Sequence, residues 1–407
     1  MVVSKAPAKQ RADETFTSGH SGRILFVVTL GTLCGQLGFL VLPPLLPEII
    51  TTLSISEARA GFALSVLASC TAAFRYPGGR ISDDLSRTTA IVLGLLSLIV
   101  GYGLLATATR YLTFLLGVSF VGIGLGIYVP AGFAQLSDVF ERKRGRAFGL
   151  NDAAVSLAGV FASGFAAVSI AIATWRYAFA PILIGLAVVT VLYSGWSSEP
   201  HTIQKPTLEI WPTLRRIALT PGLRSAILVA GLFMFVWNGT ISFLPIVLEA
   251  DRGLSRGASN VAYAAVFAVG VLATPLSGYC GDRIGSLPTV VTAIGSGLVG
   301  LAVLLFSSST VGVAVGILLL AVGLTGFWPP MSSYLITAFP EEHKGGDYGV
   351  VGTVYMAFGS LGPAYVGIVG GHSGYTAAYG GFLLVLVGCL LVASWLTLER
   401  YQRLRPA

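Results

Sequence analysis

Two ionisable side chains, Arg75 and Asp152, stand in stretches of sequence that are otherwise apolar. Arg75 follows the uncharged run GFALSVLASCTAA (residues 61–73), and the next acidic residue, Asp83, comes eight residues later. A guanidinium stays protonated and presents a planar fork of donors that suits a carboxylate or an oxyanion. A partly desolvated carboxylate can take up and release a proton. We therefore expect Arg75 to bind an anionic group, and Asp152 with its neighbour Asn151 to carry protons.

Both charges would lie well inside a membrane-crossing helix, where charge is costly and usually functional. In helical geometry, Arg75 lies roughly 12 Å from Asp83, and Asp152 lies roughly 9 Å from Arg146, so their depths are similar. Two other interpretations remain open. The Arg75 side chain could extend along its helix to the membrane surface, or the two charges could simply neutralise each other.

The elements that must position these residues are long apolar helices. The chain has 407 residues, of which 54% are hydrophobic and 11% charged, whereas soluble domains carry about 25% charged residues. Apolar runs of about 20 residues can cross a bilayer as helices. The sequence therefore predicts an all-α membrane protein. Its twelve predicted spans are residues 23–47, 59–81, 89–109, 112–137, 147–173, 176–198, 225–249, 258–281, 288–307, 310–338, 348–371 and 376–398.

Lysine and arginine residues predict the orientation of these spans. With both termini in the cytoplasm, 19 of the 25 fall in cytoplasmic segments and five outside, as the positive-inside rule requires. The net charge of +7 is thus assigned to loops and not to a nucleic-acid partner. We predict a plasma-membrane protein with a central loop that contains either a short interfacial helix at 207–219 or a plain linker. Its parts are a tail 1–22, a six-helix bundle 23–198, the loop 199–224, a second six-helix bundle 225–398 and a tail 399–407.

The two six-helix halves repeat each other. GFLVLPPLLPE (Gly38–Glu48) and GTISFLPIVLE (Gly239–Glu249) share the pattern of a glycine, a proline and a glutamate at an offset of 201. The ends of the second and eighth spans share G-x-x-x-D at an offset of 199. Glycines there permit close helix approach, and the carboxylates can meet a helix end or a loop arginine. We predict a gating latch from these residues, the alternative being ordinary polar helix ends. The predicted gating residues are Gly79, Asp83, Arg87, Gly278, Asp282 and Arg283.

These features resemble the major facilitator superfamily. GRISDDLSRT and GYCGDRIGSL resemble the family's G-x-L-A-D-R-x-G-R-[RK] loops, and DVFERKRGRAFG (Asp138–Gly149) resembles its loop between helices four and five. RYPGGRISD (Arg75–Asp83) is similar to the R-x-P-x-G-x-x-x-D motif of nitrate/nitrite porters, but Thr274 stands where those carry a second arginine. The resemblance implies two pseudo-symmetric six-helix bundles, with no substrate subfamily assigned.

In that family, helices one, four, seven and ten line a central cavity. The resemblance therefore implies substrate-binding roles beside Arg75 for a set of polar and aromatic residues, although core packing is an alternative for any one aromatic. This set is Gln36, Tyr128, Trp237, Asn238, Trp328 and Tyr355. Pro329 and Pro330 should kink or break the tenth span.

Features found in one half only are the better candidates for the site, because an asymmetric substrate needs asymmetric groups. Arg75 corresponds to Thr274 in the other half, and Asp152 corresponds to Gly352. Asn151 likewise corresponds to an apolar residue. The repeat thus separates a shared scaffold from a charged pair that is not shared.

No catalytic triad, zinc-ligand spacing or phosphate-binding loop appears, so no enzyme activity, cofactor or metal is expected. The four cysteines lie in apolar runs and are expected to be small core residues. We predict a monomeric secondary transporter working by alternating access, proton-coupled, with a small anionic solute as substrate. The alternatives are an exporter of amphipathic compounds and a membrane receptor or scaffold without transport.

Overall fold

The structure is a computed structural model that describes residues 15–140, 143–197, 215, 221–337 and 344–404. Its described part is helical and contains no strand. The interfacial helix or linker considered for the central loop lies outside the described residues, except for Arg215.

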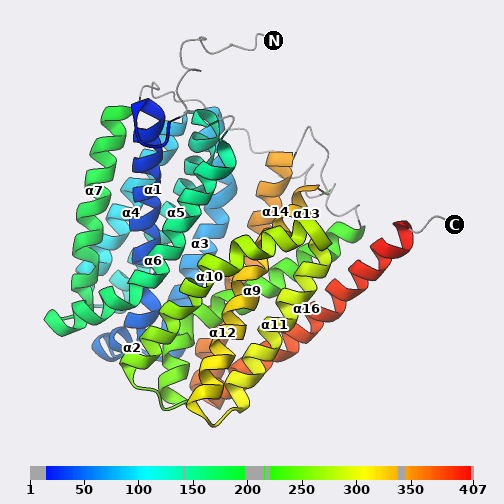
Figure 1. The fold of residues 1–407 in the computed structure, drawn as a ribbon. Coiled ribbons are helices and arrows are strands. Elements are labelled where there is room, and N and C mark those ends of the chain that lie inside the picture. The colour runs from blue at the N-terminus through cyan, green and yellow to red at the C-terminus, as the bar shows by residue number, and fades with distance from the viewer. Residues whose placement is uncertain (1–14, 141–142, 198–214, 216–220, 338–343, 405–407) are drawn as a thin grey trace.

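The first half of the chain forms one helix bundle (Figure 1). Its elements are α1 (Gly19–Leu40), α2 (Leu42–Leu53), α3 (Glu57–Asp84), α4 (Arg87–Ala106), α5 (Tyr111–Val139), α6 (Arg144–Ile172), the 3-10 helix η2 (Trp175–Ala178) and α7 (Phe179–Trp196). The second half forms the other bundle. Its elements are α9 (Pro221–Ala250), α10 (Arg256–Ile284), α11 (Ser286–Phe306), α12 (Thr310–Gly326), α13 (Trp328–Thr337), α14 (Lys344–Gly359), α15 (Leu361–Ser373) and α16 (Tyr375–Leu404).

These helices account for all twelve predicted spans. Within the described residues, eleven helices are long and apolar enough to cross a membrane. The remaining span is α3, whose 28 residues would extend about 42 Å and which packs along α5. It is the least apolar span because it carries charged residues at both ends as well as Arg75.

Three spans are broken where proline removes a backbone donor. The first breaks at Val41 before Pro43, and the eleventh breaks at Ser360 before Pro363. The tenth breaks at Phe327 before Pro329, which confirms the predicted interruption.

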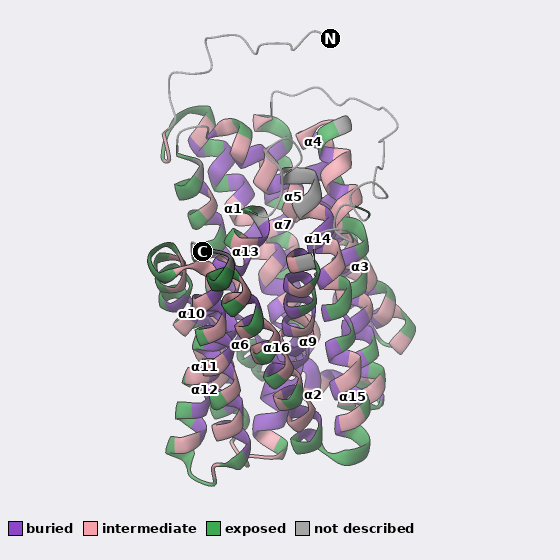
Figure 2. Cartoon of the chain, turned by 90° about the vertical axis from the view of Figure 1, so that its right-hand side faces the viewer, coloured by how far each residue is buried: buried purple, intermediate pink, exposed green. Residues whose placement is uncertain are grey.

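Exposed residues lie along the outer faces of the helices (Figure 2), and many of them are large and apolar. Phe306 and Leu384, for example, are 77% and 75% exposed. Patches of this extent are unusual on soluble monomers. Here lipid acyl chains would cover them, whereas the buried positions face neighbouring helices.

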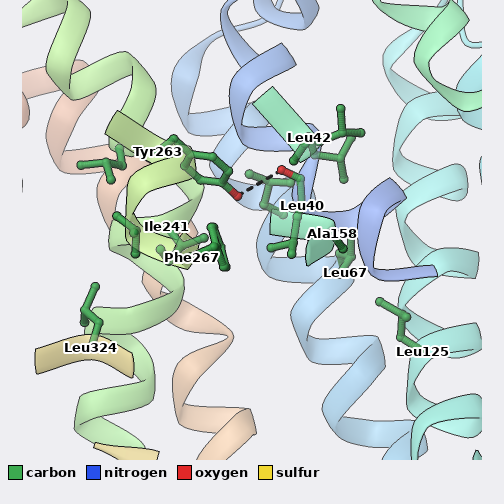
Figure 3. Close-up of a cluster of buried hydrophobic side chains, with 14 of the residues drawn as sticks. Leu40, Leu42, Leu67, Leu125, Ala158, Ile241, Tyr263, Phe267 and Leu324 are labelled. Atoms are coloured by element: carbon green, nitrogen blue, oxygen red, sulfur yellow. Dashed lines mark hydrogen bonds between the residues drawn. The ribbon is translucent and has the colours of Figure 1, made fainter. Parts of the chain in front are cut away.

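The two bundles meet along two seams, which we name by their helices. In the α3–α15 seam, the backbone N–H of Ala364 donates to Ser65 Oγ at 2.8 Å, and Gly61 lies against the backbone of Gly367. In the α6–α10 seam, Ser163 Oγ donates to the Asn260 carbonyl at 2.6 Å. Beside it, Tyr263 donates to the Leu40 carbonyl at 3.0 Å, as Figure 3 shows.

These contacts lie toward one end of the molecule. We call this the far end, where α3 begins and α15 ends, and the opposite end, where α1 begins, the termini end. Toward the termini end, no atom lies within 4 Å of the point where a Cβ would sit on Gly149 of α6 or Gly349 of α14. The hydrogen bonds named here between the bundles thus lie toward the far end.

Candidate functional site

Arg75 reaches from the first bundle to the second. It is half-buried on α3, and its Nε lies 3.5 Å from the point where a Cβ of residue 352 would sit. The guanidinium end of Arg75 therefore lies within van der Waals reach of α14 at this position. The hydroxyl oxygen of Tyr355 lies 3.8 Å from the same point. Arg75 and Tyr355 therefore flank one small space between the bundles.

No hydrogen bond or ion pair ties Arg75 to another residue in the part of the chain that the structure describes. The side chain is turned against α14 and does not simply run along its own helix to the termini end. Its donors are thus free to receive an anionic group from outside the protein.

An aromatic cluster adjoins this space. We use that name for Phe233, Phe327, Trp328 and Tyr355. The rings of Trp328 and Tyr355 have centroids 5.3 Å apart, and Phe233 stacks on Phe327 at 3.7 Å. Tyr355 is only 7% exposed, whereas Trp328 is half-buried. Two predicted site residues, Trp328 and Tyr355, are therefore brought together beside Arg75.

The other predicted binding residues are more dispersed. Trp237 and Asn238 on α9 and Gln36 on α1 are half-buried, and Asn238 Nδ2 lies 3.0 Å from the point where a Cβ of Gly359 would sit. Asn238 therefore contacts the end of α14, two turns beyond Gly352.

Tyr128 occupies a packing position. It is 1% exposed, its hydroxyl donates to the Val28 carbonyl at 2.7 Å, and its ring and backbone fill the spaces left by Gly31 and Gly94. These contacts join α5 to α1 and α4 and correspond to the packing alternative for this residue. Two glycines facing one tyrosine are a signal that periodicity alone does not give.

Asn151 and Asp152 differ in their surroundings although they are adjacent. Asn151 is buried, and its Oδ1 accepts a hydrogen bond from Thr32 of α1 at 2.8 Å. Asp152 is exposed and has no ion pair or hydrogen bond in the described part of the chain. Thr32, which holds Asn151, was not singled out from the sequence.

Asp152 lies on the face of α6 that looks toward α10. It precedes Gly159 by seven residues, two helical turns, and the Phe267 ring of α10 fills the space beside Gly159. α10 runs antiparallel to α6. Continuing their pairing from Phe267 by seven residues brings Asp152 level with Thr274.

The two seams thus carry equivalent positions with different side chains. Arg75 faces Gly352 across the first seam, and the repeat relates this pair to Thr274 and Asp152 on the second seam. Because α3 packs on α14 and α15 while α6 packs on α1 and α10, the cation and the carboxylate lie on different flanks. No ion pair between them is present among the described residues, so mutual neutralisation is not observed.

Of the predicted gating residues, those in the first half form an ionic cluster. Arg87 of α4 pairs with Asp83 of α3, with Asp138 of α5 at 2.9 Å, and donates to Ser82 at 3.1 Å. One guanidinium thus ties together the ends of three helices in the same bundle. Gly79 faces open space.

The equivalent residues in the second half are arranged differently. Asp282 and Arg283 are exposed, and Arg283 lies over the Tyr279 ring at 4.8 Å. Gly278 faces Pro329 at 3.7 Å. Ser286 stands where the first half has Arg87, so the cation that holds the first cluster has no counterpart at that position.

The repeated glutamates meet at the far end, which the sequence did not indicate. Arg256 Nη1 lies 3.5 Å from Glu48 Oε2 of the first bundle, and its Nε lies 3.9 Å from Glu249 Oε2 of its own bundle. The offset of 201 marked both glutamates, but their shared arginine follows no repeated pattern.

Known proteins resemble the chain in sequence and in fold. A probable 4-methylmuconolactone transporter of Cupriavidus pinatubonensis is 25% identical over 84% of this chain and 82% of its own length. A gentisate transporter of Corynebacterium glutamicum is 27% identical over 66% of this chain and 63% of its own. The crystal structure of a bacterial homologue of the human lysosomal transporter Spinster, inward-facing and occupied, has a TM-score of 0.74, 15% identity and covers 93% of this chain and 96% of that one.

The family profile of the Major Facilitator Superfamily matches residues 28–318 and 226–407. The match extends over both bundles, and the order and packing of the helices agree with it. The chain therefore belongs to the Major Facilitator Superfamily and is a multi-pass membrane transporter, not an enzyme.

Proposed function

We propose that the substrate is a small organic anion that carries a ring, and that its transport is coupled to a proton. The observation that carries this proposal is Arg75, which has no partner among the described residues, beside Gly352 and next to the aromatic rings of Tyr355 and Trp328. A guanidinium binds a carboxylate through paired hydrogen bonds, and aromatic side chains stack on a flat ring. The relatives named for gentisate and for 4-methylmuconolactone support this substrate class.

Asp152 is the proposed proton carrier. It is ionisable, exposed, not shared between the halves and not held by an ion pair in the described residues, so protonation would not break an existing structural contact. Asn151 accepts a hydrogen bond from Thr32 and would therefore hold the α6 backbone beside Asp152 against α1.

The proposed orientation places both termini in the cytoplasm, in a plasma membrane. The excess of lysine and arginine on that side supports it. With this orientation the termini end is cytoplasmic, and the hydrogen bonds between the bundles at the far end support an inward-facing state. We propose that the protein is a monomer. Its two bundles, 23–198 and 225–398, would rock about the site between them.

In this cycle the substrate would bridge the bundles. Arg75 belongs to the first bundle, whereas Tyr355 and Trp328 belong to the second. An anion bound by all three would draw the bundles together at the termini end. The Arg87 cluster, which keeps α3, α4 and α5 in fixed relation, would let the first bundle move as a unit.

The test is transport into proteoliposomes that contain the purified protein, with an imposed pH gradient. We expect uptake of a hydroxybenzoate such as gentisate, and loss of most of it in Arg75→Lys, because lysine keeps the charge but not the planar fork. Arg110→Lys, an exposed arginine at the far end, is the matched control and should transport normally.

The same assay separates the alternatives. Wild-type uptake by Arg75→Lys would contradict the proposed anion site. Transport of amphipathic cations but not of ring anions would favour the exporter, and absence of any flux with retained binding would favour a receptor. Inclusion of nitrate tests the substrate of the porters that the α3 motif resembles.

A further inference from the structure

An apolar groove runs along the outside of the first bundle between α1 and α6, separate from the site at Arg75. It is open, encloses about 410 Å³, and its walls are almost wholly apolar. Several wall residues are strongly exposed: Phe26 is 56% exposed and Leu150 is 48% exposed. The residues that form its two long walls are Phe26, Leu30 and Leu33 of α1 and Leu150, Ala153 and Leu157 of α6.

On the termini side of each wall, the same helix carries an arginine. On α1, Arg23 precedes Phe26 by three residues, and on α6, Arg146 precedes Leu150 by four. Residues three or four apart share one face of a helix, so both arginines extend the apolar stripes. Both side chains are exposed.

Aromatic rings lie beside two cations at this level, Arg23 and Lys143. The Arg23 guanidinium lies 5.7 Å from the Trp196 ring, and Lys143 Nζ lies 5.6 Å from the ring of Phe16, which itself lines the groove. Aromatic residues of this kind concentrate where the lipid headgroups begin. The groove therefore has a basic, aromatic rim above an apolar channel.

One residue of the groove wall carries an unsatisfied polar atom. Thr29 lines the groove, and its hydroxyl oxygen is buried and has no hydrogen-bond partner in the described part of the chain. Thr29 follows Arg23 by six residues, roughly 9 Å along the helix. After rotation of the Thr29 side chain, a carbonyl of an ester below a headgroup could accept this hydrogen bond.

We infer that the groove binds one anionic phospholipid, with its phosphate among Arg23, Arg146 and Lys143 and an acyl chain between α1 and α6. The charge of the rim selects an anionic headgroup, and the length of the apolar walls suits an acyl chain. The occupant would affect transport, because α6 also carries Gly159 and Ser163 of the α6–α10 seam.

In the experiment, the purified protein is placed in vesicles of mixed phosphatidylcholine and phosphatidylglycerol. Native mass spectrometry then measures which lipid the protein retains. We expect one phosphatidylglycerol to be retained by the wild type in preference to phosphatidylcholine. Arg23→Gln with Arg146→Gln should weaken its binding roughly 30-fold, from two lost cation contacts near the membrane surface. Arg23→Lys with Arg146→Lys should retain it, and Arg110→Gln at the far end is the control.

A third variant tests the apolar channel with the rim intact. Ala153→Phe should fill the groove and release the lipid while leaving all cations in place. Equal retention of phosphatidylglycerol by the wild type and the double glutamine variant would overturn the inference. Full retention by Ala153→Phe, or equal retention of phosphatidylcholine by the wild type, would overturn it as well, and neither outcome depends on the transported substrate.

Discussion

The substitution Gly352→Asp, which gives this position the same residue type as its counterpart Asp152, should disable the proposed anion site. Gly352 is the counterpart of Asp152, and a Cβ added to it would lie 3.5 Å from Arg75 Nε and 3.8 Å from the Tyr355 hydroxyl. Both are ordinary van der Waals distances, and residue 352 lies within the helix α14. A side chain therefore fits there, and Gly352→Asp would place a carboxylate directly against the guanidinium.

The size of the effect follows from the competition between this carboxylate and the substrate for one cation. Two unit charges 4 Å apart interact by about 4 kcal/mol at an effective dielectric constant of 20. This Coulomb energy overstates the net interaction, because Arg75 is half-buried and the new carboxylate loses hydration. The net free energy is better approximated by that of a hydrogen bond to a charged group, about 1.5–3 kcal/mol. Gly352→Asp should therefore weaken binding of an anionic substrate by about 10- to 150-fold.

The assay is equilibrium binding of gentisate to the purified protein by calorimetry, together with uptake in proteoliposomes. Gly352→Ala adds only the Cβ and should bind normally, with a gain of up to about 1 kcal/mol in helix stability. Gly352→Asn matches the aspartate in shape without its charge and should lose much less affinity. Unchanged affinity in a well-folded Gly352→Asp protein would refute the anion site, and equal losses in Asp and Asn variants would show a purely steric effect.

Four further substitutions test the other charged groups. Asp152→Asn should abolish proton-driven uptake but preserve substrate exchange across the membrane and normal expression, because no ion pair is broken; full proton-driven uptake would exclude a coupling role. Asp83→Asn should slow turnover with little change in equilibrium binding, and Asp282→Asn should slow it less, since only the first sits in an ionic cluster; a reversed order of the two rates would contradict this. Glu48→Gln removes the bond to Arg256 that joins the bundles at the far end and, as an exposed ion pair worth about 0.2–1 kcal/mol, should raise labelling of a cysteine placed there by an impermeant reagent at most about fivefold; unchanged labelling would show that the pair does not hold this end closed.

Much of the fold could be predicted because each membrane-crossing helix is marked by a continuous apolar run in the sequence. All twelve spans, and the interruption before Pro329, follow from apolar length and proline chemistry. The break at Val41 was not predicted, although Pro43 and Pro44 could have indicated it.

For the site, the sequence could indicate which residue types bind an anion, but not which residues contact each other across the bundles. Arg75 was singled out by its charge, but its contact with Gly352 depends on how α3 and α14 meet across the bundles, and no local pattern encodes that. Tyr128 illustrates the converse: the ring is fixed by the absent side chains of Gly31 and Gly94, which a span-by-span analysis does not compare.

The separation of Arg75 from Asp152 has an electrical consequence. If transport is coupled as proposed, the empty carrier holds one fixed positive and one negative charge in its centre. The loaded carrier holds the same guanidinium paired with an anion, beside a protonated and neutral carboxyl group. Both reorientation steps then move no net charge across the bilayer. Transport of a monovalent anion with one proton would be electroneutral, so the pH difference would drive it and the membrane voltage would not.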